Sequence, residues 1–186
     1  MRHYKNRPEV HAGSMADIAF LLLIFFLITT KIPNEKGVMR GLPQKCPPNV
    51  ECNIDLNERN VLRLLVNEKG ELFLNDDTIE MNNLKNELKM FIDNNGDKTC
   101  TYCNGDSIIT SSDNPKVAAI SLSTHRKAPY ATFIEVQDEI TKAYYDLRMV
   151  YAEAVLQKKT TELSEEDIEK IKKAYPFVLS EAEIID

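Results

Sequence analysis

The feature that most constrains this chain is an apolar run near its start, residues 12–32, in which every residue from 18 to 28 is apolar. At about 1.5 Å of rise per residue, a helix of this length measures about 30 Å and spans the hydrocarbon of a bilayer. One carboxylate, Asp17, lies inside the run. A charged Asp at the centre of a bilayer costs ~2.5–3.5 kcal/mol, and such residues usually face protein or water. The run predicts a transmembrane helix with Asp17 as its functional candidate.

Two other interpretations of this run compete with the first. A cleaved signal peptide also has a basic start and an apolar core, although residues 27–33 contain no small-x-small cleavage site. Alternatively, Asp17 lies only ~7–8 Å along the helix axis from Ala12 and would cap the helix among the lipid headgroups. The sequence alone leaves both interpretations open.

Charge and cysteine placement indicate which way the helix is oriented. The short leader is basic, so it is expected to stay in the cytoplasm; its cations are Arg2, Lys5 and Arg7. All four cysteines follow the apolar run, and an even number on one side indicates an oxidising compartment there. The formal net charge of −6 argues against a nucleic-acid partner. We therefore expect a single-pass protein of a bacterial inner membrane with a periplasmic carboxyl-terminal part.

The 186 residues leave room for one compact domain beside the membrane helix. Proline and glycine are frequent from 33 to 60, which discourages regular structure. Beyond this point we expect a small α+β domain. It contains a sheet of two, three or more strands, and two helices pack against that sheet. The predicted parts are a leader (1–11), a transmembrane helix (12–32), a linker (33–60), an α+β domain (61–159) and a charged, helical carboxyl-terminal extension (160–186).

Periodicity places the elements within that domain. Strands are predicted at 61–66 and 71–74, joined by a turn at 67–70, and a third strand at 117–123. Helices are predicted at 80–93 and from Pro129 to about 158, and a short charged helix followed by a tail from 160 onward. The longer helix carries a stripe at steps of three and four residues: Phe133, Val136, Ile140, Tyr144, Leu147, Tyr151 and Val155.

The cysteines permit three interpretations. We favour two structural disulfides among Cys46, Cys52, Cys100 and Cys103, with three possible pairings. A zinc site would use the same four residues, but the spacing between the first two is loose for zinc. A redox-active Cys-x-x-Cys is least favoured, because such motifs need a helix N-terminus and Asn104 and Gly105 follow instead. We predict no metal and no other cofactor.

The membrane segment resembles that of a known family. Residues 13–27, Gly-Ser-Met-Ala-Asp-Ile-Ala-Phe-Leu-Leu-Leu-Ile-Phe-Phe-Leu, resemble the single membrane helix of the ExbD/TolR biopolymer-transport family, and Asp17 matches its essential Asp. Residues 61–75 resemble the family's first hairpin, and 117–124 followed by Tyr130 resemble its core strand and next helix. Residues 180–183, Ser-Glu-Ala-Glu, look like the tail of a longer ExbD-like subgroup.

The chain also departs from the family pattern. Members commonly follow the second helix with a Gly and another strand, whereas residues 152–159 continue the helical pattern here. No Gly occurs after Gly105. The sequence therefore leaves open whether a final strand exists.

The resemblance implies a stator subunit of a proton-driven motor. Family members pair with a second copy inside a pentamer of the membrane protein ExbB, protons pass by way of the Asp, and the motion drives TonB. The pore or pairing face implied for this chain comprises Ser14, Ala16, Phe20, Leu21 and Ile24. The resemblance leaves open whether a TonB, Tol-Pal or gliding-type system is energised.

A second hypothesis comes from the TolR branch. In this alternative the helix only anchors the protein, and the periplasmic head binds peptidoglycan or envelope proteins. An enzyme is not expected, because the exported His125, beside Arg126, has no Ser, Cys or carboxylate partner that the sequence places near it.

Overall fold

The structure is a computed structural model that describes residues 12–29 and 57–184. The chain divides into two compact units, Met1–Cys52 and Asn53–Asp186, which we describe separately. The boundary between them falls inside the predicted linker. The predicted leader, the linker up to residue 56, and both Cys46 and Cys52 lie outside the described residues, so what the sequence indicates for them stays a prediction.

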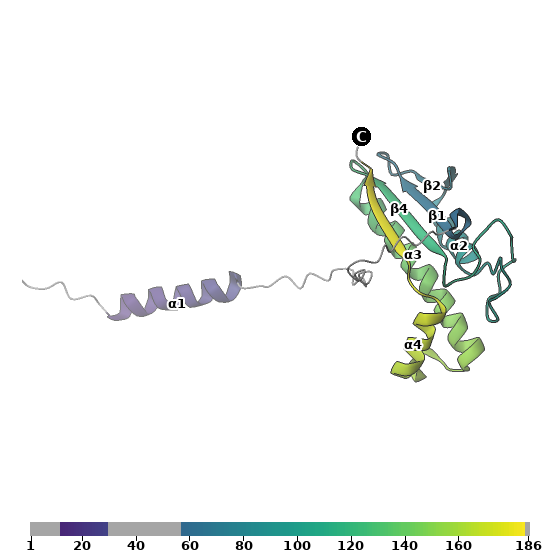
Figure 1. The fold of residues 1–186 in the computed structure, drawn as a ribbon. Coiled ribbons are helices and arrows are strands. Elements are labelled where there is room, and N and C mark those ends of the chain that lie inside the picture. Colours follow the sequence, from purple (N-terminus) through teal and green to yellow (C-terminus); the bar gives the residue numbers. More distant parts are fainter. Residues whose placement is uncertain (1–11, 30–56, 185–186) are drawn as a thin grey trace, which may run out of the picture. The chain divides into compact units, whose positions relative to one another are not determined.

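The first unit contains helix α1, Ala12–Thr29, drawn in purple in Figure 1. None of its residues is buried in the chain's own fold. Its apolar side chains occupy the whole circumference, a pattern found in helices surrounded by lipid or by other proteins. By length and composition α1 can cross a membrane, in agreement with the predicted span.

The second unit is a five-stranded mixed sheet with order β3-β2-β1-β4-β5. The central pair is parallel, as is the pair at one edge, while the hairpin strands are antiparallel. The strands are β1 (Val61–Val66), β2 (Leu72–Leu74), β3 (Asp77–Ile79), β4 (Ala119–His125) and β5 (Leu179–Ile184).

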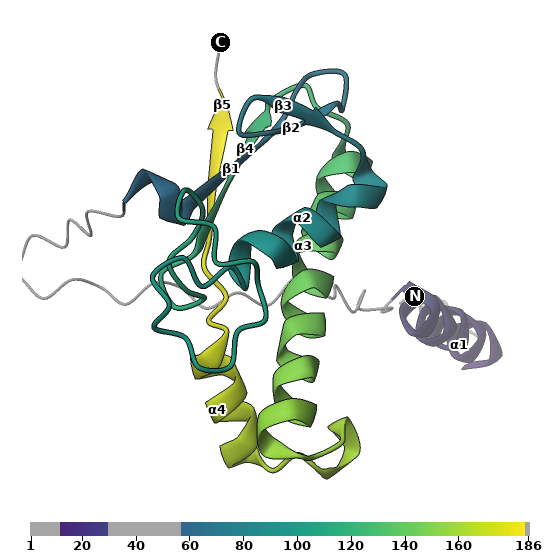
Figure 2. The same ribbon diagram turned by 90° about the vertical axis from the view of Figure 1, so that its right-hand side faces the viewer.

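Helices α2 (Met81–Ile92) and α3 (Tyr130–Tyr151) cover one face of this sheet, as Figure 2 shows. The α+β prediction is therefore confirmed. Along β1 alternate side chains point toward these helices and are buried: Leu62, Leu64 and Val66. The stripe predicted on the long helix lies against the same core up to Tyr151. Val155 does not, because it belongs to a π-helical turn, η2 (Ala152–Leu156), and is 47% exposed.

Two turns organise the hairpins. The predicted turn is present: the Asn67 side-chain oxygen accepts from the amides of Lys69 and Glu71, and Gly70 has a φ of 80°. The second turn, at Asn75 and Asp76, has positive φ at both residues, a geometry that joins two strands tightly. It creates β3, a short strand that the sequence analysis missed.

The carboxyl-terminal part begins with a helix and ends in a strand. Helix α4, Glu165–Ala174, starts with a capping box in which Ser164 and Asp167 bond to each other's backbone amides. It confirms the predicted charged helix. The predicted tail is wrong, because Leu179–Ile184 is strand β5, paired in parallel with β4.

The chain reaches β5 without a glycine, by way of Gln157. This residue adopts the left-handed conformation, with φ 54° and ψ 36°, at the position where helices often end with Gly. The missing Gly therefore did not prevent the chain from turning back toward the sheet.

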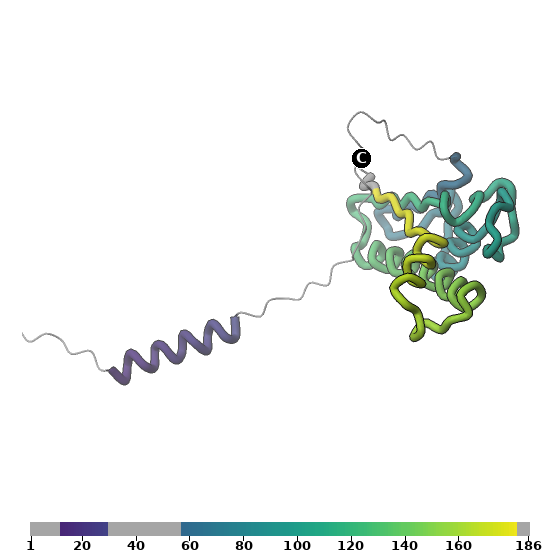
Figure 3. The backbone as a smooth tube through the Cα atoms, turned by 60° about the horizontal axis from the view of Figure 1, so that its bottom comes forward, coloured from purple at the N-terminus to yellow at the C-terminus, as the bar shows by residue number. Residues whose placement is uncertain are grey.

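A long loop links α2 to β4 and is visible as the irregular teal-green tube in Figure 3. Asn94, at the start of this loop, is only 1% exposed. Its side-chain nitrogen donates to the carbonyl oxygens of Ile108 and Ser112, and its side-chain oxygen accepts from the Ile108 amide. The loop also passes so close to Asp93 that a Cβ on Gly105 would lie 2.3 Å from the Asp93 carbonyl oxygen. The loop is thus held against the end of α2.

Candidate functional site

Asp17 lies on the second turn of α1 and is the only charged residue between Ala12 and Thr29. Among the described residues it has no hydrogen-bond or ion-pair partner. Carboxylates within apolar segments of this length usually face protein or water. Asp17 is thus the one charged side chain of α1, and it is exposed.

The predicted pore or pairing face lies on the same helix. Because α1 is a regular helix, Phe20, Leu21 and Ile24 lie three, four and seven residues beyond Asp17 and share its side. Toward the amino-terminal end the residues are small, including Ser14 and Ala16, and a Cβ added to Gly13 would meet nothing within 4 Å. Close approach of a second helix is sterically open there. The role of this face stays a prediction.

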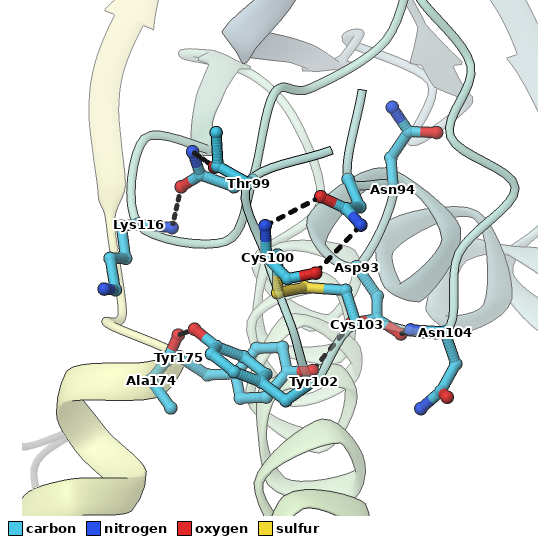
Figure 4. Close-up of a disulfide and its surroundings, with 12 residues drawn as sticks. Asp93, Asn94, Thr99, Cys100, Tyr102, Cys103, Asn104, Lys116, Ala174 and Tyr175 are labelled. Atoms are coloured by element: carbon cyan, nitrogen blue, oxygen red, sulfur yellow. Dashed lines mark hydrogen bonds between the residues drawn. A yellow bond between two sulfur atoms is a disulfide. The ribbon is translucent and has the colours of Figure 1, made fainter. Parts of the chain in front are cut away.

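The head carries a disulfide between Cys100 and Cys103, shown in Figure 4. The sequence left the pairing open, and this pair encloses only two residues. Sulfur atoms joined to each other are not thiolates and cannot ligate zinc. No group of three or more metal-ligating side chains gathers in the described parts of the chain. The residues after Cys100 do not form a helix, so the pair lacks the N-terminus that a redox enzyme uses.

Tyr102, inside the disulfide loop, links this loop to the carboxyl-terminal part of the head. Its hydroxyl donates to the Ala174 carbonyl oxygen at 2.8 Å. Its ring packs edge-on against Tyr151 and Tyr175, with centroid distances of 5.0 and 5.5 Å. Three tyrosines from the loop, α3 and the end of α4 thus form one aromatic cluster.

Asp93, at the carboxyl end of α2, is the buried acid beside this cluster. Its carboxylate accepts from the Tyr175 hydroxyl at 2.6 Å and from the Asn104 amide at 3.0 Å. Burial raises the pKa of Asp93 above its ordinary value, while the Tyr175 and Asn104 hydrogen bonds partly lower it. Burial and the neighbouring Asp93 raise the pKa of Tyr175, which therefore stays protonated and donates. The sequence analysis missed this pair, since its partners are 82 residues apart.

A cleft of about 590 Å³ opens next to Asp93. Its walls are the start of β1, the Asn75–Asp76 turn, the end of α2 and the loop around residues 104–111. Two of the cations that line this cleft form ion pairs with carboxylates: Arg59 with Asp113 at 2.5 Å, and Lys89 with Asp146 at 3.6 Å. No sequence pattern marked this cleft, because its walls come from four separate segments.

A second cleft, of about 530 Å³, is lined by His125, Arg126, Tyr130 and Glu181, among others. The His125 ring nitrogen Nδ1 accepts from the Lys127 amide at 3.2 Å, and the Glu181 carboxylate accepts from Gln137. A carboxylate that the sequence did not place near His125 therefore lines the same cleft.

Comparison with known protein families covers both α1 and most of the head. The comparison with curated proteins found no match. The family model described as "Biopolymer transport protein ExbD/TolR" matches residues 3–153, which include α1 with Asp17 and the head as far as α3. Since this match covers most of the 186 residues, the chain belongs to the ExbD/TolR family of biopolymer transport proteins.

Proposed function

We propose that the chain is the proton-motive-force-driven stator subunit of an ExbB–ExbD-type motor that energises TonB-dependent outer-membrane transport. Asp17 is its proton carrier. The observation that carries this proposal is the single carboxylate within the apolar helix α1 of a chain from a biopolymer-transport family. Transport in such a family needs a source of energy, and Asp17, the one titratable side chain of helix α1, is the group proposed to couple it to proton flow.

The energetics suit this role. A proton crossing the membrane releases about 2.3 kcal/mol per 100 mV. When Asp17 is ionised, it must stay near polar groups of a surrounding pore; when it is protonated, it can move into apolar surroundings. The helix thus has two preferred positions, and alternation between them converts proton flow into motion.

The proposed assembly has α1 and the α1 of a second copy inside a pentameric, ExbB-like membrane partner, with a TonB-like protein as the driven element. The amino terminus lies in the cytoplasm and the head in the periplasm. Basic residues in the leader support this orientation. The Cys100–Cys103 disulfide on the head supports it as well, because disulfides persist in oxidising compartments.

The decisive experiment replaces Asp17 by Asn. Asn keeps the shape and polarity of the side chain but cannot carry a proton, so energised uptake and proton flux through the assembled complex should fall to the level of cells lacking the chain. Membrane insertion and expression should be unchanged. Both are measured in cells and in vesicles carrying the partner protein.

Two control variants sharpen this test. Asp17→Glu keeps a titratable carboxylate and should retain part of the activity. Glu153→Gln removes an exposed carboxylate of the head and should leave activity intact. If Asp17→Asn still supports energised uptake, the proton-carrier proposal fails and the interpretation of an anchor with a peptidoglycan-binding head replaces it.

A further inference from the structure

The Cys100–Cys103 disulfide holds a very small ring at the surface of the head. The ring encloses Thr101, which is exposed, and Tyr102, which is half-buried, and both cysteines are themselves half-buried. A disulfide restricts the unfolded chain less when its loop is short. This pair therefore contributes little to holding distant parts of the head together, and its two cysteines are partly exposed at the surface.

The flanks of the ring are anchored by bonds that do not involve sulfur. On one side the Asn95 side chain accepts from the Cys100 amide and donates to the Cys100 carbonyl oxygen, at 2.9 and 3.0 Å. On the other side the Asn104 amide donates to Asp93. Figure 4 shows the disulfide with Asp93 and Asn104 beside it. Opening the S–S bond therefore removes the covalent link around Thr101 and Tyr102 and leaves the loop attached on either side.

The residue that this opening would release is Tyr102. With the ring closed, Tyr102 ties the loop to Ala174, the last residue of α4, and to the rings of Tyr151 and Tyr175. The chain runs from Tyr175 to strand β5 within four residues. Tyr102 thus connects the disulfide ring to the segment that leads into the edge strand β5.

We propose that Cys100–Cys103 is a thiol–disulfide exchange site, at which a dithiol reductant on the exported side of the membrane unlocks Tyr102 from the aromatic cluster. The exported location rests on the orientation proposed above. The chain serves here as the substrate of the exchange and not as its catalyst, consistent with the absence of a helix after Cys100 in the described loop.

The exchange proceeds in two balanced steps. A thiolate of the dithiol attacks one cysteine sulfur, a mixed disulfide forms, and the other cysteine leaves as a thiolate that takes up a proton. The second thiol of the reductant then attacks the mixed disulfide and releases the first cysteine. Two electrons and two protons pass to Cys100 and Cys103, and the reductant becomes a cyclic disulfide.

The test uses the full chain in neutral detergent, in a Cys46→Ser/Cys52→Ser background that removes the other two cysteines. Dithiothreitol is titrated against its oxidised form, free thiols are alkylated, and the labelled peptides are identified by mass spectrometry. We expect both cysteines to become labelled together and reversibly, while the circular dichroism of the head is retained.

Hydrogen exchange then reports on Tyr102. On reduction, exchange should accelerate at least tenfold at residues 101–103 and 174–178, and remain unchanged in β1. The Cys100→Ser/Cys103→Ser variant should show the fast exchange without reductant and no response to it. Tyr102→Phe, which loses only the hydroxyl bond to Ala174, should accelerate exchange at 174–178 in the oxidised chain by a smaller factor.

Two results would overturn the proposal: a pair that is reduced only after the head is denatured, or a pair that is reduced without faster exchange at residues 174–178. Asp17→Asn in the same background should respond to dithiothreitol as the parent does. Failure of the redox proposal is therefore separable from failure of the proton-carrier proposal.

Discussion

Among single residues of the head, Asp93 is a buried acid whose cost of burial is partly offset by its neighbours. It is 8% exposed, and burial raises its pKa. The hydroxyl of Tyr175 donates to one carboxylate oxygen and the amide of Asn104 to the other. Both bonds favour the ionised form and thereby moderate the rise. Folded Asp93 still binds its proton more tightly than unfolded Asp93, so ionising it as the pH rises lowers the stability of the head.

Replacing Tyr175 by Phe should destabilise the head, and more so at neutral than at acidic pH. The ring and its packing are kept, but a buried carboxylate loses a donor, a loss of about 1–3 kcal/mol. Because that donor lowers the pKa of Asp93, its removal raises the pKa further. The added loss of stability should therefore be present near pH 7 and shrink toward pH 4, as the falling pH protonates Asp93.

Urea unfolding of the full chain at both pH values measures this difference. Tyr145→Phe is the matched control, since Tyr145 is 55% exposed on α3 and should show no loss at either pH. Equal destabilisation by Tyr175→Phe at the two pH values would show that Asp93 does not sense the hydroxyl.

At the scale of elements, the sequence was informative wherever burial imposes a period. Strand β1 and helices α2 and α3 follow from the spacing of apolar residues, because each packs one face on the core. Strand β3 has only three residues, too few to show a period. The turn at Asn75 and Asp76 marks this strand in the sequence more clearly than the strand's own residues do. Strand β5 escapes detection because an edge strand carrying Glu181 has no apolar alternation to reveal it.

The candidate site also contains residues that can be recognised from the sequence and residues that cannot. Asp17 stands out in the sequence as a candidate, because it is the one carboxylate within an apolar run and such residues usually face protein or water. The aromatic cluster of Tyr102, Tyr151 and Tyr175 is not, because its members come from three segments brought together only by the tertiary fold. The Cys100–Cys103 pairing likewise could not be chosen from the sequence, because four cysteines allow three pairings.

Gln157 allows a test at the scale of the element it ends. It is exposed and has a left-handed backbone, which costs a residue with a Cβ about 1–2 kcal/mol relative to a right-handed one. Gln157→Gly relieves this cost but adds freedom to the unfolded chain. We expect a net gain of roughly 0.5–1 kcal/mol, seen as a higher urea midpoint with an unchanged slope.

The matched control is Lys159→Gly, two residues further on. Lys159 is also exposed, but its φ is −80°, so glycine brings no relief there and should lower stability slightly. If both substitutions destabilise the head equally, the turn after η2 does not depend on the left-handed residue.

At the scale of the whole molecule, the two units differ in whether they bury their own apolar side chains. The head buries its own core, with Leu64, Val66, Leu122 and Ile140 at 1% exposure or less. Helix α1 buries nothing within the chain, and large apolar side chains such as Phe20 and Leu27 are 59% and 70% exposed. The head thus buries its own apolar core, whereas α1 exposes its apolar side chains and is long and apolar enough to cross a membrane.

The last prediction concerns a polar partner for Asp17. An isolated α1 in lipid must bury an ionised Asp17 at a cost of ~2.5–3.5 kcal/mol, protonate it, or draw it to the interface. A surrounding pore with hydroxyl groups or water removes most of this cost, and the small residues near Gly13 let a second copy approach. Gentle extraction from native membranes should therefore recover the chain with its own copy and with a polytopic partner in excess.

Photocrosslinkers at Leu21, on the Asp17 side of the helix, and at Phe26, on the opposite side, should both yield protein adducts, because an enclosed helix touches protein all round. The control is Asp17→Asn, which should keep these adducts, since Asn still needs polar partners. Recovery of monomers alone, with adducts to lipid only, would contradict the enclosed stator.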